Sequence, residues 1–236
     1  MSAGLPMTAR VIAIDGPAGT GKSTTAREVA RRLGWRYVDS GAFYRVAALL
    51  ALRHGLGLAD PADRARLRQV LEDADIEQEV LGGASHTRLA GEDVSVEIRT
   101  PAVTAIVSRV ADDPALREIV NAGLRAQVGE GPAVIDGRDI GTVVFPEAFL
   151  KVYLDATLEE RARRRVAEAE PARAADPVAL TSYAQSLAER DRRDRERSVA
   201  PLRMAEDALH IDTSGLDFDS QVARIVRAAR DRIGST

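Results

Sequence analysis

The residues from Gly16 to Ser23 carry the clearest chemical signal in this sequence. They read Gly-Pro-Ala-Gly-Thr-Gly-Lys-Ser and fit the pattern G-x-x-x-x-G-K-[ST]. In this pattern the glycines let successive backbone N–H groups turn inward and form a nest for an anion. Lys22 can then reach the β- and γ-phosphates of a nucleotide, and the hydroxyl of Ser23 can ligate Mg²⁺. The stretch therefore predicts a phosphate-binding loop.

Lysine is rare in this chain, which favours the same interpretation. Of the 33 lysines and arginines, only Lys22 and Lys151 are lysines. A lysine at the end of the loop in so arginine-rich a background indicates that a compact ammonium is needed there, rather than a planar guanidinium.

The residues around the loop predict the strand and the helix that must position it. Val11–Asp15 reads as a buried strand, and Ser23–Leu33 has the spacing of an amphipathic helix. Four more strands are predicted at residues 35–39, 133–136, 149–154 and 209–212. Helices are predicted at residues 42–54, 61–73, 101–111, 113–128, 158–170, 178–195 and 218–233. Strands that alternate with helices predict an α/β fold with a parallel, doubly wound sheet.

Residues 61–100 break this alternation. Short strands at 76–80, 86–89 and 93–96, separated by glycines, predict a small antiparallel sheet. We expect a core of residues 10–60 and 101–236 and an insert of residues 61–100.

Two polar motifs follow predicted strands, where open α/β sheets bind their ligands. The first runs from Asp39 through Ser40 to Arg45, and Arg45 could hold a phosphate. The second is Asp136-Gly137-Arg138-Asp139, whose arginine can form a bidentate fork with phosphate. Each has a plainer interpretation: Asp39 and Ser40 cap a helix, and Arg138 pairs with a local aspartate.

An arginine-rich segment lies further along the chain. Arg190, Arg193, Asp194 and Arg197 share one face of a predicted helix, which could also be an ordinary solvated surface. Arg161 and Arg165, four apart on the preceding helix, could face the same place. Two arginine-bearing helices around a small-residue loop, residues 171–177, are typical of a lid that closes over phosphates; we place it at about 161–197.

Composition excludes several classes. The chain has no cysteine, so disulfides and cysteine-based sites are absent. Its net charge of −3 gives no indication of nucleic-acid or membrane binding. We see no signal peptide, membrane span or coiled-coil pattern, and expect a cytoplasmic monomer.

The motifs together resemble a known family over about residues 11–233. The matching stretches are Gly16–Ser23, Asp39–Arg45, Gly91–Ser95 with Ile98–Thr100, Asp136–Pro146, and Glu189–Asp194 with Ala200–Leu202. They resemble the bacterial cytidylate kinases, and the string from Asp136 to Pro146 is far more specific than the phosphate loop. Ser23 is one departure, because many members carry a small residue without a hydroxyl there.

The resemblance implies a P-loop nucleoside monophosphate kinase fold: a five-stranded parallel sheet flanked by helices, a monophosphate-binding insert and a lid. It also implies ATP or dATP as donor, CMP or dCMP as acceptor, and Mg²⁺.

Site residues are implied by position. The ATP-binding residues would be Gly16, Pro17, Ala18, Gly19, Thr20, Gly21, Lys22, Ser23 and Thr24. Ser108, Arg117 and Asp139 would contact cytosine; Arg45, Arg138 and Arg197 the acceptor phosphate; Arg190 and Asp194 the ribose. Asp39, Ser40, Tyr44 and Asp136 complete the substrate set, while Lys22, Arg165 and Arg193 would stabilise the transferring group.

Two other hypotheses remain. One is a kinase for shikimate or a different nucleotide on the same core. The other is a GTPase-type switch, which needs an Asn-Lys-x-Asp element that this chain, with lysine only at positions 22 and 151, does not contain.

The predicted lid can be tested by hydrogen exchange. Backbone amides between about Arg161 and Arg197 should exchange more slowly when a bisubstrate analogue is added, because its phosphates neutralise the mutual repulsion of the arginines. Unchanged exchange throughout this segment would contradict the lid.

Overall fold

The computed structural model describes residues 10–129 and 131–234. The chain folds into two compact units. One contains residues 10–36 and 131–234, and the other contains residues 37–129.

The predicted five-stranded parallel sheet is present, with the strand order β2-β6-β1-β7-β8. Its strands are β1 (Val11–Asp15), β2 (Arg36–Asp39), β6 (Ala133–Asp136), β7 (Leu150–Asp155) and β8 (Leu209–Asp212). β1 lies at the centre and pairs in parallel with β6 and β7. Every residue of β1 is buried, which explains its continuous apolar run. The parallel pairing aligns the carboxyl ends of β1 and β6, where the polar motifs begin.

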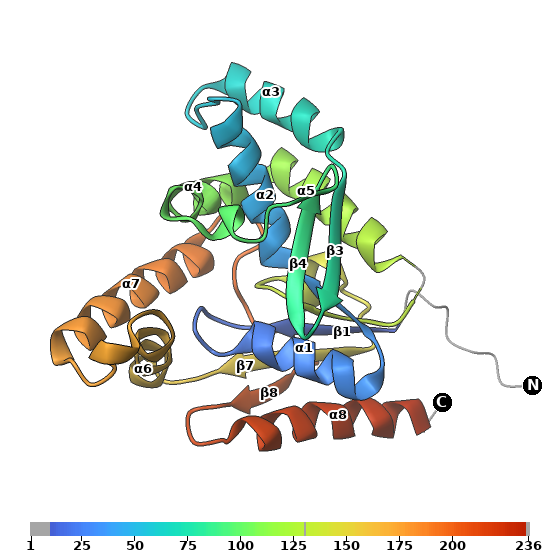
Figure 1. Cartoon of the computed structure of the whole chain (residues 1–236). Coiled ribbons are helices and arrows are strands. Elements are labelled where there is room, and N and C mark those ends of the chain that lie inside the picture. The colour runs from blue at the N-terminus through green and yellow to red at the C-terminus, as the bar shows by residue number, and fades with distance from the viewer. Residues whose placement is uncertain (1–9, 130, 235–236) are drawn as a thin grey trace, which may run out of the picture. The chain divides into compact units, whose positions relative to one another are not determined.

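The helices of the first unit are α1 (Lys22–Leu33), α6 (Leu158–Ala169), α7 (Pro177–Glu196) and α8 (Phe218–Gly234). α1 and α8 pack against each other beside the sheet (Figure 1). α6 and α7 pack against each other too, and the short 3₁₀ turn η4 (Pro171–Arg173) lies between them in the chain. The predicted strands and helices of this unit are confirmed, with ends that differ by one or two residues.

The second unit contains four helices and a small sheet among its described residues. The helices are α2 (Ser40–Arg53), α3 (Pro61–Glu72), α4 (Pro101–Asp112) and α5 (Pro114–Val128). The sheet is antiparallel and consists of β3 (Ile76–Leu81), β4 (Ala84–Leu89) and β5 (Glu92–Asp93).

One predicted strand was wrong in extent. Residues 93–96 were expected to be extended, but β5 ends at Asp93 and the 3₁₀ turn η2 (Glu97–Arg99) follows. The reason is local: the Asp93 carboxylate accepts a hydrogen bond of 2.9 Å from the backbone N–H of Ser95. An aspartate that binds the backbone two residues on turns the chain out of a strand.

The compact units do not follow the predicted boundaries at residues 60 and 100. Residues 37–60 and 101–129 group with the small sheet, because α2 packs against α3, α4 and α5. Whether residues 61–100 act as a separate monophosphate-binding insert stays a prediction.

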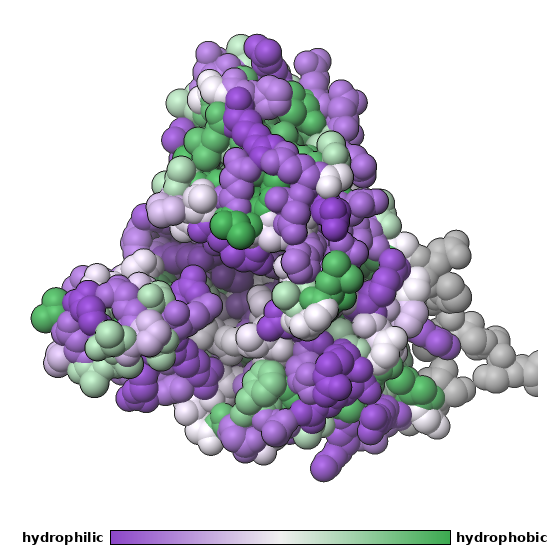
Figure 2. Space-filling model, viewed as in Figure 1, coloured by the Kyte–Doolittle hydropathy of each residue, from purple (hydrophilic) through white to green (hydrophobic). Residues whose placement is uncertain are grey.

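The surface over α6 and α7 is largely hydrophilic (Figure 2). Ion pairs between arginine and glutamate of the same helix contribute to this hydrophilic surface. Examples are Arg163 with Glu160 on α6 and Arg192 with Glu189 on α7. In the described part of the chain, no helix is both long enough and apolar enough to cross a membrane.

A pair of glycine variants tests the packing at the end of β1. A Cβ on Gly16 would lie 2.0 Å from the backbone oxygen of Leu154 on β7, at a φ of +148°. We expect Gly16→Ala to lower the free energy of unfolding by about 3 kcal/mol, through overpacking added to backbone strain. Gly34→Ala, at a φ of +68° with nothing within 4 Å, should cost only about 1 kcal/mol of strain. Equal losses in denaturant unfolding would contradict the close approach.

Candidate active site

The phosphate loop connects the carboxyl end of β1 to the first turn of α1. Gly16, Gly19 and Gly21 have φ angles of +148°, +81° and +82°, which side chains with a Cβ rarely adopt. Within the described part of the chain, no side chain caps α1 at Gly21, and its first turn has no acidic residue. Backbone N–H groups at the start of this helix are therefore available to an anion, as a phosphate nest requires.

Lys22 is buried, although it lies at the end of a glycine-rich loop. It is 6% exposed, and its ammonium donates hydrogen bonds to the Pro17 carbonyl at 2.6 Å and to the Thr20 hydroxyl at 3.4 Å. Burial lowers the pKa of Lys22 well below its usual value, and the positive charges of Arg138 and Arg190 lower it further. The side chain thus lies over its own loop, in the field of other cations.

Ser23 and Asp136 meet beside the loop. The serine hydroxyl donates a 2.7 Å hydrogen bond to the Asp136 carboxylate. The register of β1 and β6 places Asp136, at the end of β6, opposite Ile14. Thr24, the next residue along α1, donates to the Gly21 carbonyl at 2.8 Å instead. A hydroxyl and a carboxylate together offer the hard oxygen ligands that Mg²⁺ prefers.

No protein cage for a metal exists among residues 10–129 and 131–234. No group of three or more His, Cys, Asp or Glu side chains there could hold an ion by itself. Mg²⁺ in nucleotide enzymes is bound by one or two carboxylates together with substrate phosphates and water. The Ser23–Asp136 pair therefore fits a magnesium ion that arrives with a nucleotide.

Arg138 and Arg197 approach the same aspartate on α7. Arg138 donates to Asp194 at 2.9 Å, so its partner is distant in sequence, not the adjacent Asp139. Arg197 lies 3.9 Å from the other oxygen of Asp194, and its side chain is only 6% exposed. Among the described residues, its Nε and Nη2 atoms have no hydrogen-bond partner. Unsatisfied buried donors of a guanidinium indicate a site for an anion.

Two further predicted residues belong to this unit. Asp139 is buried directly before the π-helical turn η3 (Ile140–Val144). Arg190, half-buried on α7, is close enough to lower the pKa of Lys22. The charges of Asp136, Arg138 and Arg190 thus all act on Lys22, and the roles predicted for these residues stay predictions.

The arginines predicted to stabilise the transferring group lie at the surface. Arg165 pairs with Glu168 of its own helix at 2.6 Å, and Arg193 pairs with Glu189 of its own helix at 2.8 Å. Arg193 is 59% exposed. Their catalytic role stays a prediction.

Arg161 does face α7, as the sequence allowed, but it is buried there and is not part of an exposed basic surface. Its guanidinium is buried and ion-paired with Asp191 of α7, and it donates to the Ala18 carbonyl at 3.0 Å. The Ala18 N–H donates to Asp191 at 3.2 Å. Gly19 allows this approach, because a Cβ there would lie 3.2 Å from the Cβ of Arg161. Arg161 and Asp191 thus connect α6 and α7 to the phosphate loop.

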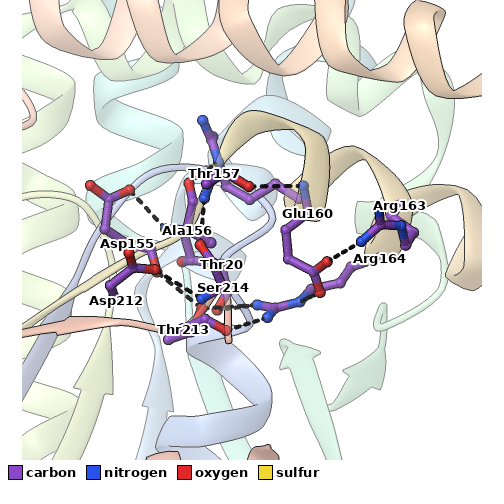
Figure 3. A network of polar contacts seen from close by, with 11 residues as sticks. Thr20, Asp155, Ala156, Thr157, Glu160, Arg163, Arg164, Asp212, Thr213 and Ser214 are labelled. Atoms are coloured by element: carbon purple, nitrogen blue, oxygen red, sulfur yellow. Dashed lines mark hydrogen bonds and ion pairs between the residues drawn. The ribbon is translucent and has the colours of Figure 1, made fainter. Parts of the chain in front are cut away.

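Arg164 makes a second connection to the loop region (Figure 3). It donates to the carbonyl of Thr213 at 2.7 Å and to its hydroxyl at 3.0 Å, directly after β8. The same guanidinium donates to Glu160 at 2.9 Å and reaches the Thr20 carbonyl at 3.5 Å. The start of α6, the segment after β8 and the phosphate loop are therefore tied by one arginine.

In the second unit, Asp39 caps a helix, and its predicted contact with substrate stays a prediction. Its carboxylate caps α2 by accepting from the Ala42 N–H at 3.1 Å, and Arg99 lies 3.7 Å away. The side chain of Gln78, on β3, pairs with both backbone groups of Asp39, at 2.8 and 2.9 Å. Ser40 follows as a buried first residue of the helix.

The other predicted residues of this unit lie on α2, α4 and α5. Arg45 donates to the Ile98 carbonyl at 3.1 Å and to the Thr104 hydroxyl at 2.9 Å. Arg117 is buried with its guanidinium 5.2 Å from the centre of the Tyr44 ring, a cation–π contact. Ser108 is half-buried on α4.

Comparison with known proteins agrees with these motifs. Residues 12–231 match the model of the family described as cytidylate kinase. The chain belongs to the cytidylate kinase family.

Named members of the family are similar over nearly the whole chain. The cytidylate kinase of Solibacter usitatus is 42% identical over 94% of this chain and 93% of its own length, and that of Geobacillus sp. (strain WCH70) is 43% identical over 94% and 97%. The bifunctional pantoate ligase/cytidylate kinase of Synechococcus sp. (strain CC9902) is 44% identical over 94% of this chain, which spans 46% of that longer protein.

A solved structure shows a likeness of fold alone. It is an uncharacterised protein from Eubacterium ventriosum, with a TM-score of 0.50 and 13% identity over 94% of this chain and 99% of that one.

Three residues of this family member were not found by sequence reasoning: Asp15, Asp191 and Gln78. Asp15 closes an apolar strand, and Asp191 lies within a charged run, so each had a visible but ambiguous signal. Gln78 lies in a short strand without any distinguishing pattern. Their contacts join segments 39 to 173 residues apart, which no local pattern reveals.

The two lysines of this family member provide a matched test of the phosphate loop. Lys22→Met keeps most of the buried volume, so the fold should persist while turnover falls by about 10²–10³-fold, the effect of one lost charge contact in a transition state. Lys151→Met removes the ion pair of 2.9 Å with Asp207 and should leave turnover nearly unchanged. Near-normal turnover of Lys22→Met would contradict the assignment of the loop.

Proposed function

We propose that this protein transfers the γ-phosphoryl group of ATP or dATP to CMP or dCMP. The observation that carries the proposal is the cluster of cations at the ends of β1 and β6. It contains the buried Lys22 with Arg138 and Arg190 in its field, and Arg197, two of whose buried nitrogens have no hydrogen-bond partner among the described residues. Such a cluster needs several anionic oxygens, and two nucleotides supply them.

The chemistry that we propose needs no general base. The acceptor phosphate of CMP is already an anion, and one of its oxygens forms the new bond to the γ-phosphorus. The bond from the γ-phosphorus to the oxygen that bridges it to the β-phosphate breaks, and ADP leaves with the electron pair. Catalysis then consists of positioning and charge stabilisation, which we assign to Lys22 with Arg165 and Arg193.

Magnesium would be held by Ser23, with Asp136 beside it. When bound, the ion would neutralise charge on the β- and γ-phosphates. A polyphosphate beside Lys22 would also oppose the two effects that lower its pKa, burial and neighbouring cations, and so favour the charged ammonium.

The acceptor contacts are proposed from the family resemblance. We assign Arg45, Arg138 and Arg197 to the phosphate, and Arg190 and Asp194 to the ribose. The two buried nitrogens of Arg197 that lack a hydrogen-bond partner within residues 10–129 and 131–234 support its role. The pairing of Arg138 with Asp194 means that both side chains would reorganise or share partners when a nucleotide binds.

Cytosine recognition is assigned to Ser108, Arg117 and Asp139. Cytosine presents an amino donor at position 4 beside acceptors at N3 and O2, so it requires one acceptor and neighbouring donors. Asp139 would supply the acceptor, and Arg117 and Ser108 the donors. Arg117 is held by the Tyr44 ring and by a 3.0 Å bond to the Ala111 carbonyl, which limits its motion.

Two features of organisation remain proposals. We propose that residues 161–197 form a lid, and that the protein acts as a monomer. The connection of Arg161 and Asp191 to Ala18 supports a lid whose fixed end lies at the phosphate loop.

A coupled assay of ADP release tests the function against its rivals. ATP with CMP or dCMP should turn over far faster than ATP with UMP, AMP or shikimate. Comparable turnover with shikimate or AMP would favour the alternative small-molecule kinase.

Base selection can be tested at Asp139. Uracil would place a carbonyl against the carboxylate and a ring N–H against a donor, at about 1–3 kcal/mol for each unpaired group. Two mismatches together reach a factor of about 10²–10⁴ in kcat/KM. Asp139→Ala should lose much of the CMP activity and narrow the CMP-to-UMP ratio. Asp139→Asn should also narrow the ratio, because its amide can accept from the amino group of cytosine or donate to the carbonyl of uracil. If the CMP-to-UMP ratio of kcat/KM is unchanged in both variants, Asp139 does not select the base, and Ser108 and Arg117 would have to do so.

A further inference from the structure

Asp15 is a buried carboxylate that has no part in the proposed mechanism. It is the last residue of β1 and is almost completely buried. Its two carboxylate oxygens accept hydrogen bonds from the backbone N–H groups of Ile140 and Gly141, at 2.9 and 2.8 Å. Both donors are main-chain groups at the start of η3, directly after Arg138 and Asp139.

The local backbone explains why this segment needs a partner. β6 ends at Asp136, and η3 is a single π-helical turn of five residues, so the N–H groups of Ile140 and Gly141 have no carbonyl partner within a preceding helix. Buried N–H groups without acceptors are costly, and one ionised carboxylate satisfies both. Gly141 is also confined on its other side, because a Cβ there would lie 3.1 Å from the side chain of Lys151.

We infer that Asp15 is a positioning residue that holds the Arg138–Asp139 segment for acceptor binding. The inference rests on the proposed function and deepens it. Through its main chain, Asp15 continues directly into Gly16 of the phosphate loop. Through its side chain, it fixes the segment predicted to contact the phosphate and base of CMP. Asp15 thus connects the ATP-binding loop to the segment predicted to bind CMP. Its replacement should weaken CMP binding more than ATP binding.

Titration of Asp15 gives this role a measurable signature. Burial raises the pKa of Asp15 to about 7, the nearby charge of Asp139 raises it too, and the two N–H donors and Lys22 act in the opposite direction. Two other titratable groups lie on the neighbouring strands. They are Asp136 at the end of β6 and Tyr153 on β7, which is in register with Asp15. As the pH falls through about 7, the carboxylate gains a proton and one oxygen is lost as an acceptor. Acceptor binding should weaken in the same interval.

The test compares Asp15→Asn with Asp155→Asn. The asparagine at position 15 keeps one acceptor oxygen and turns an NH₂ group toward the second N–H, so the segment should shift. Asp155 ends β7, and its carboxylate accepts a hydrogen bond of 2.9 Å from the backbone N–H of the neighbouring Ala156, which an amide oxygen can still do. The two variants thus make the same chemical change at the ends of adjacent parallel strands.

The expected result is a split between the two substrates. Asp15→Asn should raise the KM for CMP about tenfold or more, as expected for a lost hydrogen bond to a charged group, while the KM for ATP changes less than about twofold. The CMP-to-UMP ratio should narrow, and the difference between pH 6 and pH 8 in kcat/KM for CMP should become smaller than in the wild type. The phosphate of CMP titrates equally with both proteins, so only the difference between them reports Asp15. Asp155→Asn should behave as the wild type.

Several results would overturn the inference. They are a KM for ATP that rises as much as the KM for CMP, values for Asp15→Asn equal to those of Asp155→Asn, or an unchanged pH profile. If Asp15→Asn does not fold, hydrogen exchange in the wild type replaces it: protection of the Ile140 and Gly141 amides, corrected for intrinsic rates, should fall from pH 8 to pH 6. Constant protection would equally contradict the role. A wild type that does not phosphorylate CMP at all would instead overturn the proposed function.

Discussion

Positive charge buried beside the phosphate loop is the constraint on which the first unit depends. Removing an ion from water costs several kcal/mol, so each buried cation needs oxygen partners held in place by the fold. Lys22 has the carbonyl of Pro17 and the negative charge of Asp136, and the half-buried Arg138 has the carboxylate of Asp194. Arg197 departs from this rule, since two of its buried nitrogens lack a hydrogen-bond partner among the described residues. The fold therefore keeps, at a cost in stability, a cation that an incoming anion can satisfy.

The parallel sheet supplies the oxygen partners because it ends several strands at one edge. β1 leads into the glycine loop and β6 leads into the Asp136 motif, and their pairing fixes the two ends side by side. Side-chain contacts then join segments that the sheet only brings near. Ser23 contacts Asp136 across the two strand ends, and Asp15 holds the amides that follow Asp139. The site is thus stabilised by a few charge-assisted contacts on a rigid, fully buried strand, where small displacements are resisted by close packing.

The helices α6 and α7 combine a fixed base with a charged surface. At the base, Ala18 of the phosphate loop packs with Ala162 and Leu187, and the buried pair of Arg161 and Asp191 lies beside it. Away from the base, arginines and glutamates pair mainly within their own helices, and exposed pairs of this kind add little stability. A segment with this distribution can move at its far end while its base remains attached to the loop. Because of this attachment, a movement of the two helices would also shift the phosphate loop.

The sequence by itself determined the strands, the helices and the phosphate loop, because each rests on a local pattern: a β-branched run, a helical period, or glycines at fixed spacing. It also placed the polar motifs at the ends of the strands, since that follows from the order of the elements. Only the tertiary structure decided which charges meet. Arg138 pairs with Asp194 and not with Asp139, Arg161 is buried and not part of a free basic face, and Lys22 is covered. The reason is physical: an arginine on a helix has the same local pattern whether it faces water or a carboxylate 30 residues away, and only the packing of the two helices distinguishes them.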